Sequence, residues 1–147
     1  MFTVLRYKAT GEPIGFLEGV FRERDKVGEF LVYIDRRWRR RRSALAGMAM
    51  FPKYLFDSFP IRKIYCHAYD YNQESIRLMR SGGFVEEGRF REFVWWRDRY
   101  WDMHVLALSR ETWRAGERGE GPFGRVLKVA GLLRPASKDD LSSEPEN

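Results

Sequence analysis

An arginine-rich run at residues 36–42 is the segment of this 147-residue chain that points most clearly to a ligand. Six arginines flank Trp38 there, and their charge equals the whole net charge of +6. Guanidinium groups bind phosphate oxygens through paired hydrogen bonds, so the run predicts an anionic partner. Three interpretations are open: a phosphorylated small molecule, an RNA or acidic protein with Trp38 stacking on a base, and a solvated surface.

Cysteine and histidine are too scarce for most metal and redox chemistry. The chain has one cysteine, Cys66, and two histidines, which excludes an internal disulfide framework and argues against a Cys/His metal cluster. Cys66 alternates with Ile64 and Ala68, a pattern that favours a thiol in the core over a nucleophile. We therefore predict no metal site.

The composition predicts one globular domain. The chain is 44% hydrophobic and 16% aromatic, which supplies ample material for a core. In the first half, the longest uncharged stretch is 43–52, far short of the roughly 20 residues of a membrane span. Charges at Arg6, Lys8 and Glu12 interrupt any signal-peptide pattern, so we expect a cytoplasmic protein without a membrane span.

The elements that must position these residues form a mixed α/β pattern. Strands rich in β-formers are expected at 2–8, 14–21 and 27–35, followed by helix 43–59, strand 62–69, helix 72–81 and a hairpin of 84–96 with 100–109. Pro52 inside the first helix predicts a kink or a break. The order β-β-β-α-β-α-β-β is that of a layered α/β domain.

The composition changes near Trp113, which we take as the end of a domain of residues 1–113. Residues 114–121 are expected to form a linker, and 135–147 a disordered tail. Between them, apolar residues recur at helical spacing and predict a short amphipathic helix at 122–133. This helix either covers an apolar patch of its own domain or docks on a partner or a membrane surface.

Three segments resemble motifs of the GNAT superfamily of acyl-CoA-dependent N-acetyltransferases. Residues 29–35 leading into 38–44 resemble the family's fourth strand and its pyrophosphate loop, R/Q-x-x-G-x-G/A. Residues 72–84 are similar to the segment N-x-x-S-x-x-L-x-x-x-G-F. Residues 83–92 match GFxxEGxxR, which is typical of the branch with ribosomal-protein-alanine, spermidine and aminoglycoside acetyltransferases. The resemblance covers residues 2–113 and implies a mixed, mostly antiparallel sheet with flanking helices, here without the usual first strand and first two helices.

The resemblance also implies which residues bind acetyl-CoA. The pantetheine arm would pair with the backbone of Val32, Tyr33 and Ile34, like an added strand. The phosphates would lie on the loop and helix start formed by Arg39, Arg40, Arg41, Arg42, Ser43 and Ala44, where the helix dipole favours negative charge. Asn72 would contact the cofactor near its thioester, although it is equally explained as a helix cap. Ser75, in the first turn of the same helix, would either reach the cofactor or face solvent. Arg42 stands where the family usually has glycine.

The reaction implied is transfer of an acetyl group by direct attack of a primary amine, from a protein N-terminus or a small molecule. An alkyl amine with a pKa near 10.4 must lose a proton, and Glu29 is the candidate base. Met79 occupies the position where many family members have a tyrosine that protonates the leaving thiolate.

The missing first helices usually form one wall of the acceptor site, so we expect that self-association or a partner chain completes it. Two alternatives remain open. One is a degenerate domain that binds acyl-CoA or a partner protein without turnover. The other is an RNA-associated module that uses residues 36–42.

Overall fold

The computed structural model describes residues 1–39 and 41–133. Arg40 and the expected tail at 135–147 lie outside these residues. The elements, in chain order, are β1 (Phe2–Arg6), β2 (Pro13–Arg22), β3 (Val27–Ile34), α1 (Arg42–Ser58), β4 (Lys63–Tyr69), α2 (Gln73–Ser81), β5 (Val85–Trp96), β6 (Arg99–Ser109), α3 (Arg110–Glu117) and α4 (Gly121–Ala130).

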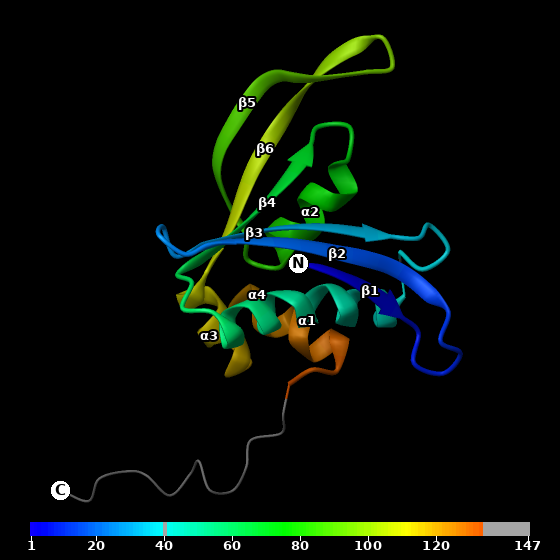
Figure 1. The fold of residues 1–147 in the computed structure, drawn as a ribbon, viewed down its shortest axis with the longest axis vertical. Helices are drawn as coiled ribbons and strands as arrows, with labels where there is room; N and C mark the ends of the chain where they lie inside the picture. Colours follow the sequence, from blue (N-terminus) through cyan, green and yellow to red (C-terminus); the bar gives the residue numbers. More distant parts are fainter. Residues whose placement is uncertain (40, 134–147) are drawn as a thin grey trace, which may run out of the picture.

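The strands form one sheet in the order β1-β2-β3-β4-β6-β5, shown in Figure 1. The pair β3–β4 is parallel, and the other four pairs are antiparallel. The predicted mixed, mostly antiparallel α/β fold is therefore confirmed, with the first eight elements in the predicted order. Pro52 lies inside α1, which runs as one helix instead of breaking there.

The helices share a hydrophobic core with one face of the sheet. Residues from all four described helices join sheet residues such as Phe30, Ile64 and Leu106 in a single buried cluster. On β3 the side chains alternate, so that Phe30 and Ile34 are buried while Leu31 and Tyr33 are 53% and 47% exposed. The opposite face of β1–β3 therefore remains open to solvent.

Cys66 belongs to the buried face of β4, as its alternation with Ile64 and Ala68 predicts. It is a free thiol that is only 6% exposed. Burial raises its pKa to about 12, because a thiolate is poorly solvated inside the core.

The C-terminal helices extend the core beyond residue 113. Trp113 is 1% exposed and packs between Phe56 and Phe123, at ring distances of 5.6 and 4.8 Å. Residues 114–121, expected to be a linker, instead hold the end of α3, a short turn and the start of α4. A Cβ atom on Gly124 would lie 2.5 Å from the backbone of Gly119, so glycine is what lets α4 pack this closely. Of the two interpretations of the amphipathic segment, the structure has the one in which it covers its own domain.

Within residues 1–39 and 41–133, no helix is both long and apolar enough to cross a membrane. The same residues contain no cluster of His, Cys, Asp and Glu side chains suited to hold a metal ion.

Candidate functional site

Strands β3 and β4 separate after a short parallel ladder. Only three residue pairs join them, and Glu29 opposite Tyr65 is the last. Beyond this pair the two strands leave in different directions, which Figure 1 shows clearly. Residues 30–34 of β3 and 66–69 of β4 therefore line a V-shaped opening in the sheet.

The backbone of β3 presents hydrogen-bonding groups to this opening. The Asp35 amide donates to the Ile14 carbonyl of β2, and bond directions alternate along an antiparallel strand. The N–H and C=O groups of Tyr33 therefore face β2, while those of Val32 and Ile34 face the opening. Among the predicted arm-binding residues, Tyr33 thus differs from its two neighbours, and its backbone is unsuited to pair with a ligand in the opening. Its ring stacks on Phe16 at 5.3 Å, on the exposed face.

The arginine run follows the end of β3, and several of its side chains have partners within the protein. Arg37 forms an ion pair with Asp35 at 3.1 Å. Arg39 Nε donates to the Ile34 carbonyl at 3.0 Å, and Arg42 Nε donates to the Val129 carbonyl at the end of α4, at 2.9 Å. These contacts fix the course of the loop.

Trp38 is part of the core instead of the surface. It is 7% exposed and packs on Tyr7 at a ring distance of 4.8 Å, and the Arg41 guanidinium lies 4.6 Å from its ring. The expectation that Trp38 could stack on an RNA base is therefore wrong, because its ring is already enclosed.

Side chains of the run also surround a hollow of about 800 Å³. Its lining comes from Arg36, Arg37, Arg39, Arg41 and Glu74. Glu74 lies in the first turn of α2, so the hollow joins the start of that helix to the loop that precedes α1. Arg41 is the N-cap of α1, so the positive end of the α1 dipole lies at this loop together with the guanidinium groups. The arrangement is suited to a ligand with several phosphates.

Ser43 and Ala44 start α1 in different environments. Ser43 is partly exposed at the helix start, whereas Ala44 is 1% exposed and packs with Ile14, Ile34 and Trp38. Ala44 therefore holds the helix start against the sheet, and only its backbone is placed to serve a ligand.

Asn72 is the N-cap of α2. Its side-chain oxygen accepts a hydrogen bond from the Ser75 amide at 3.3 Å. Asn72 is exposed and Ser75 is partly exposed, next to Glu74 of the hollow. Capping of the helix is thus observed directly, and it leaves Asn72 at the rim of the site.

Glu29 lies at the narrow end of the opening. It forms an ion pair with Arg22 at 2.6 Å, and its side chain is 31% exposed. Its ladder partner Tyr65 donates a hydrogen bond to Glu87 at 2.9 Å. Hydrogen bonding by Lys63 lowers the pKa of Glu87, while burial and the Glu87 contact raise that of Tyr65. A carboxylate and a phenol therefore lie on adjacent strands at the point where the strands separate.

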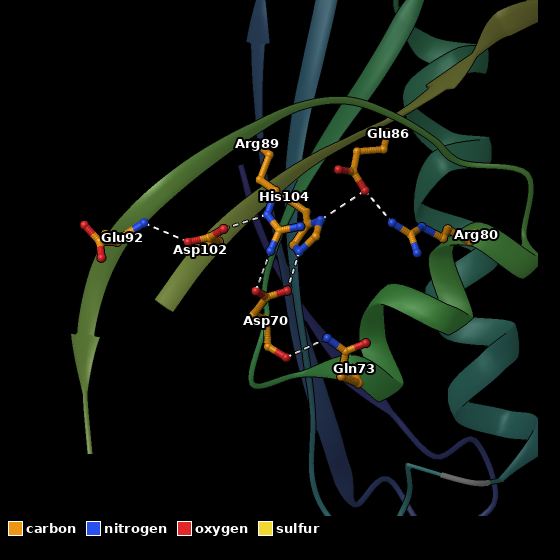
Figure 2. A network of polar contacts seen from close by, with 8 residues as sticks. All are labelled: Asp70, Gln73, Arg80, Glu86, Arg89, Glu92, Asp102 and His104. Atoms are coloured by element: carbon orange, nitrogen blue, oxygen red, sulfur yellow. Dashed lines mark hydrogen bonds and ion pairs between the residues drawn. The ribbon is translucent and has the colours of Figure 1, made fainter. Parts of the chain in front are cut away.

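A second polar cluster connects β4, α2, β5 and β6, and Figure 2 shows it. His104 of β6 is 4% exposed, with Asp70 and Glu86 on its two ring nitrogens. Burial opposes protonation of His104, but the two carboxylate contacts outweigh it and raise the pKa of the ring. Asp70 lies just before the N-cap of α2, so this cluster borders the site.

A comparison with protein families matches residues 1–84 to the "Acetyltransferase (GNAT) family". The match covers more than half of the chain. This chain belongs to the GNAT family. The recognition made from the three sequence motifs is therefore confirmed. A comparison with curated proteins found no significant match.

Solved GNAT structures share the fold at low sequence identity. A GCN5-related N-acetyltransferase from Brucella melitensis is 22% identical over 87% of this chain, with a TM-score of 0.72. The spermidine/spermine N-acetyltransferase SpeG from Vibrio cholerae is 23% identical over 77% of this chain, with a TM-score of 0.70. This chain spans 56% of the Brucella protein and 66% of the Vibrio enzyme.

The structure places two groups of residues at the site that the sequence motifs did not identify. Tyr65 lies opposite Glu29 on the neighbouring strand and donates a hydrogen bond to Glu87. Asp70 and Glu86 both contact the ring of His104. The glutamates lie within the quoted segment at 83–92, but nothing in that segment identifies their partners on β4 and β6.

Proposed function

We propose that the protein is an N-acetyltransferase that passes the acetyl group of acetyl-CoA to a primary amine. The observation that carries this proposal is the opening between β3 and β4, which leads from Glu29 to the arginine-lined hollow. Along β3, residues 29 and 34 are about 17 Å apart at the usual rise of a strand. This span suits an extended pantetheine arm with its phosphates in the hollow and its thioester near Glu29.

The groups that would hold acetyl-CoA follow this path. The backbone of Val32 and Ile34 would pair with the arm, with Arg39 releasing the Ile34 carbonyl that it now contacts. Arg39, Arg41 and the start of α1 at Ser43 would bind the phosphates. In the chain, Asn72 and Ser75 lie on either side of Glu74, which lines the hollow from the side of α2. Arg40 stays a prediction of the sequence.

Glu29 is proposed to accept the proton of the amine, directly or through water. The amine nitrogen forms a bond to the acetyl carbon, the carbon–sulfur bond breaks, and CoA leaves with the electron pair of that bond. Met79 is 6% exposed in the core and offers no acidic group, so the thiolate would take its proton from water. Because a thiol has a pKa near 8.5, the lack of an acidic side chain to protonate the leaving thiolate is tolerable.

The acceptor class is a primary amine, of a polyamine or of a protein N-terminus. The Vibrio neighbour is a spermidine/spermine acetyltransferase, which makes polyamines the first acceptors to test. The exposed face of β1–β3 is the side from which an acceptor would reach the opening.

Calorimetric titration with acetyl-CoA tests the proposal, with Arg42→Gly beside the wild type and Arg24→Gly, in the β2–β3 turn, as the control. We expect micromolar binding by the wild type and by the control. Tighter binding by Arg42→Gly would identify Arg42 as an obstruction in the loop. Absence of binding by the wild type and Arg42→Gly would refute the proposal. Binding without turnover of any amine would favour a domain that only binds acyl-CoA.

A further inference from the structure

His104 has a carboxylate at each of its two ring nitrogens. Nε2 lies 2.6 Å from Asp70 Oδ1, and Nδ1 lies 3.0 Å from Glu86 Oε2. A neutral imidazole carries one N–H and could donate to only one of them, whereas an imidazolium donates to both. The geometry in Figure 2 is therefore that of a buried cation held between two anions.

The groups around His104 come from every element packed on it. Three carboxylates and two guanidinium groups form the cluster: Asp70 after β4, Glu86 and Arg89 on β5, Asp102 on β6 and Arg80 on α2. With an imidazolium the positive and negative charges are equal in number. With a neutral ring, the partly buried cluster has one more carboxylate than positive groups, which weakens the interactions that keep Asp70 in place.

Asp70 controls how the chain enters α2. Its backbone carbonyl accepts a hydrogen bond from the Gln73 side chain at 2.8 Å. Two residues on, the Asn72 amide donates to the Tyr69 carbonyl at 2.7 Å, and the Asn72 side chain caps the helix through Ser75. A displacement of Asp70 would therefore shift Asn72 and the first turn of α2.

We propose that His104 is a positioning residue for the acetyl-CoA site: its imidazolium holds Asp70 so that Asn72 and the first turn of α2 stay at the rim of the arginine-lined hollow. This inference rests on the proposed function for its ligand. His104 itself does not touch the ligand. It acts through the first turn of α2, which faces the arginine loop across the hollow.

The proposal gives binding a pH dependence with a definite sign. The folded-state pKa of His104 lies above its ordinary value of 6.5, so the ring is an imidazolium below that folded value. As the pH rises through it, one carboxylate contact is lost and acetyl-CoA affinity falls. We expect a decrease of about threefold to tenfold, typical of a residue that is coupled to a ligand indirectly.

The test is calorimetric titration with acetyl-CoA between pH 5.5 and 9 in four proteins. The wild type and the control Asp98→Asn, which changes an exposed carboxylate in the turn between β5 and β6, should show the same fall in affinity. His104→Gln should bind more weakly at low pH and lack this fall. Asp70→Asn keeps the shape of the side chain but removes a negative charge, so the midpoint of the fall should move to lower pH.

A direct measurement of the ring accompanies the titration. The chain has two histidines, so the His67→Gln variant assigns the His104 signal in an NMR titration. The midpoint of this signal should agree with the midpoint of the fall in affinity, and both should move together in Asp70→Asn. Identical binding profiles in the wild type, His104→Gln and Asp70→Asn would overturn the proposal.

A readout without ligand separates this proposal from the proposed function. Amide hydrogen exchange at Ser75 and Ile76 should show lower protection in His104→Gln than in the wild type, because both amides donate to Asn72. Unchanged protection would refute the role of His104 in holding α2. A wild-type protein that binds no acetyl-CoA at any pH would instead refute the proposed function, and the exchange result would still decide whether His104 holds the helix.

Discussion

Glu29 combines three features that a proton acceptor at the proposed site needs. It is on the last rung before β3 and β4 separate, it is partly exposed, and its ion pair with Arg22 fixes its carboxylate. For Glu29→Gln we expect kcat to fall by about 100-fold, the lower end of what general-base catalysis contributes. The loss should shrink as the pH rises, because more of the amine is then already neutral. Steady-state rates between pH 6.5 and 9.5 measure this.

The matched control is Glu18→Gln, which removes an exposed carboxylate from the neighbouring strand. This variant should keep the wild-type kcat, and both variants should bind acetyl-CoA with unchanged affinity. A Glu29→Gln enzyme with wild-type kcat at neutral pH would exclude Glu29 as the proton acceptor and direct attention to Tyr65 and Glu87.

Single residues were predictable from the sequence where their role is local. The arginine run and the cap at Asn72 depend on neighbours within a few positions, so their pattern is visible in the chain. The contacts of Tyr65 and His104 depend on strand register across 18 to 34 positions. Alternation reveals which face a side chain occupies but not its partner, and the register shift between Glu86 and Gly88 adds a further offset.

Helix α4 is held in place mainly by its apolar face. Phe123 and Leu127 are 3% and 2% exposed, and Phe123 packs on Trp113. We expect Phe123→Ala to lower the free energy of unfolding by about 3 to 5 kcal/mol, the usual cost of removing a buried phenyl ring. Urea denaturation followed by tryptophan fluorescence measures the change.

Val129→Ala is the matched control on the same helix, because this side chain is 54% exposed. Its backbone carbonyl, which accepts the bond from Arg42, is retained. The control should change stability by less than about 0.5 kcal/mol. Similar small effects in both variants would show that α4 contributes little to the fold.

At the level of elements, the hydrophobic periodicity predicted the strands and most helices, because each buries one face. It did not predict α3, because Gly116 and Gly119 within 114–121 are equally typical of a linker. In the structure Gly116 permits a close approach instead, since a Cβ atom there would meet Phe123 at 2.9 Å. Glycine marks both a flexible connection and a tight helix contact, and sequence alone does not distinguish them.

The molecule as a whole has a single sheet with helices packed on one face, while the other face is open to solvent over β1–β3. The order of elements predicted the layered α/β class, and the family motifs predicted the topology. The place where β3 and β4 part was not readable, because both strands continue with the same residue types beyond Glu29 and Tyr65. An opening in a sheet is defined by where pairing stops, which depends on the twist of the whole sheet.

The rate at which Cys66 reacts with a thiol reagent measures how often the core opens. As the chain's one thiol, with a pKa raised to about 12, it exists as thiolate in roughly one molecule in ten thousand at pH 8. A thiol-reactive dye should therefore label the native protein far more slowly than an unfolded one, and bound acetyl-CoA should slow labelling further. Rapid labelling of the native protein would contradict the burial of Cys66. Because the Cys66 thiol reacts so slowly, the same dye would record each CoA molecule released during turnover with almost no signal from the enzyme.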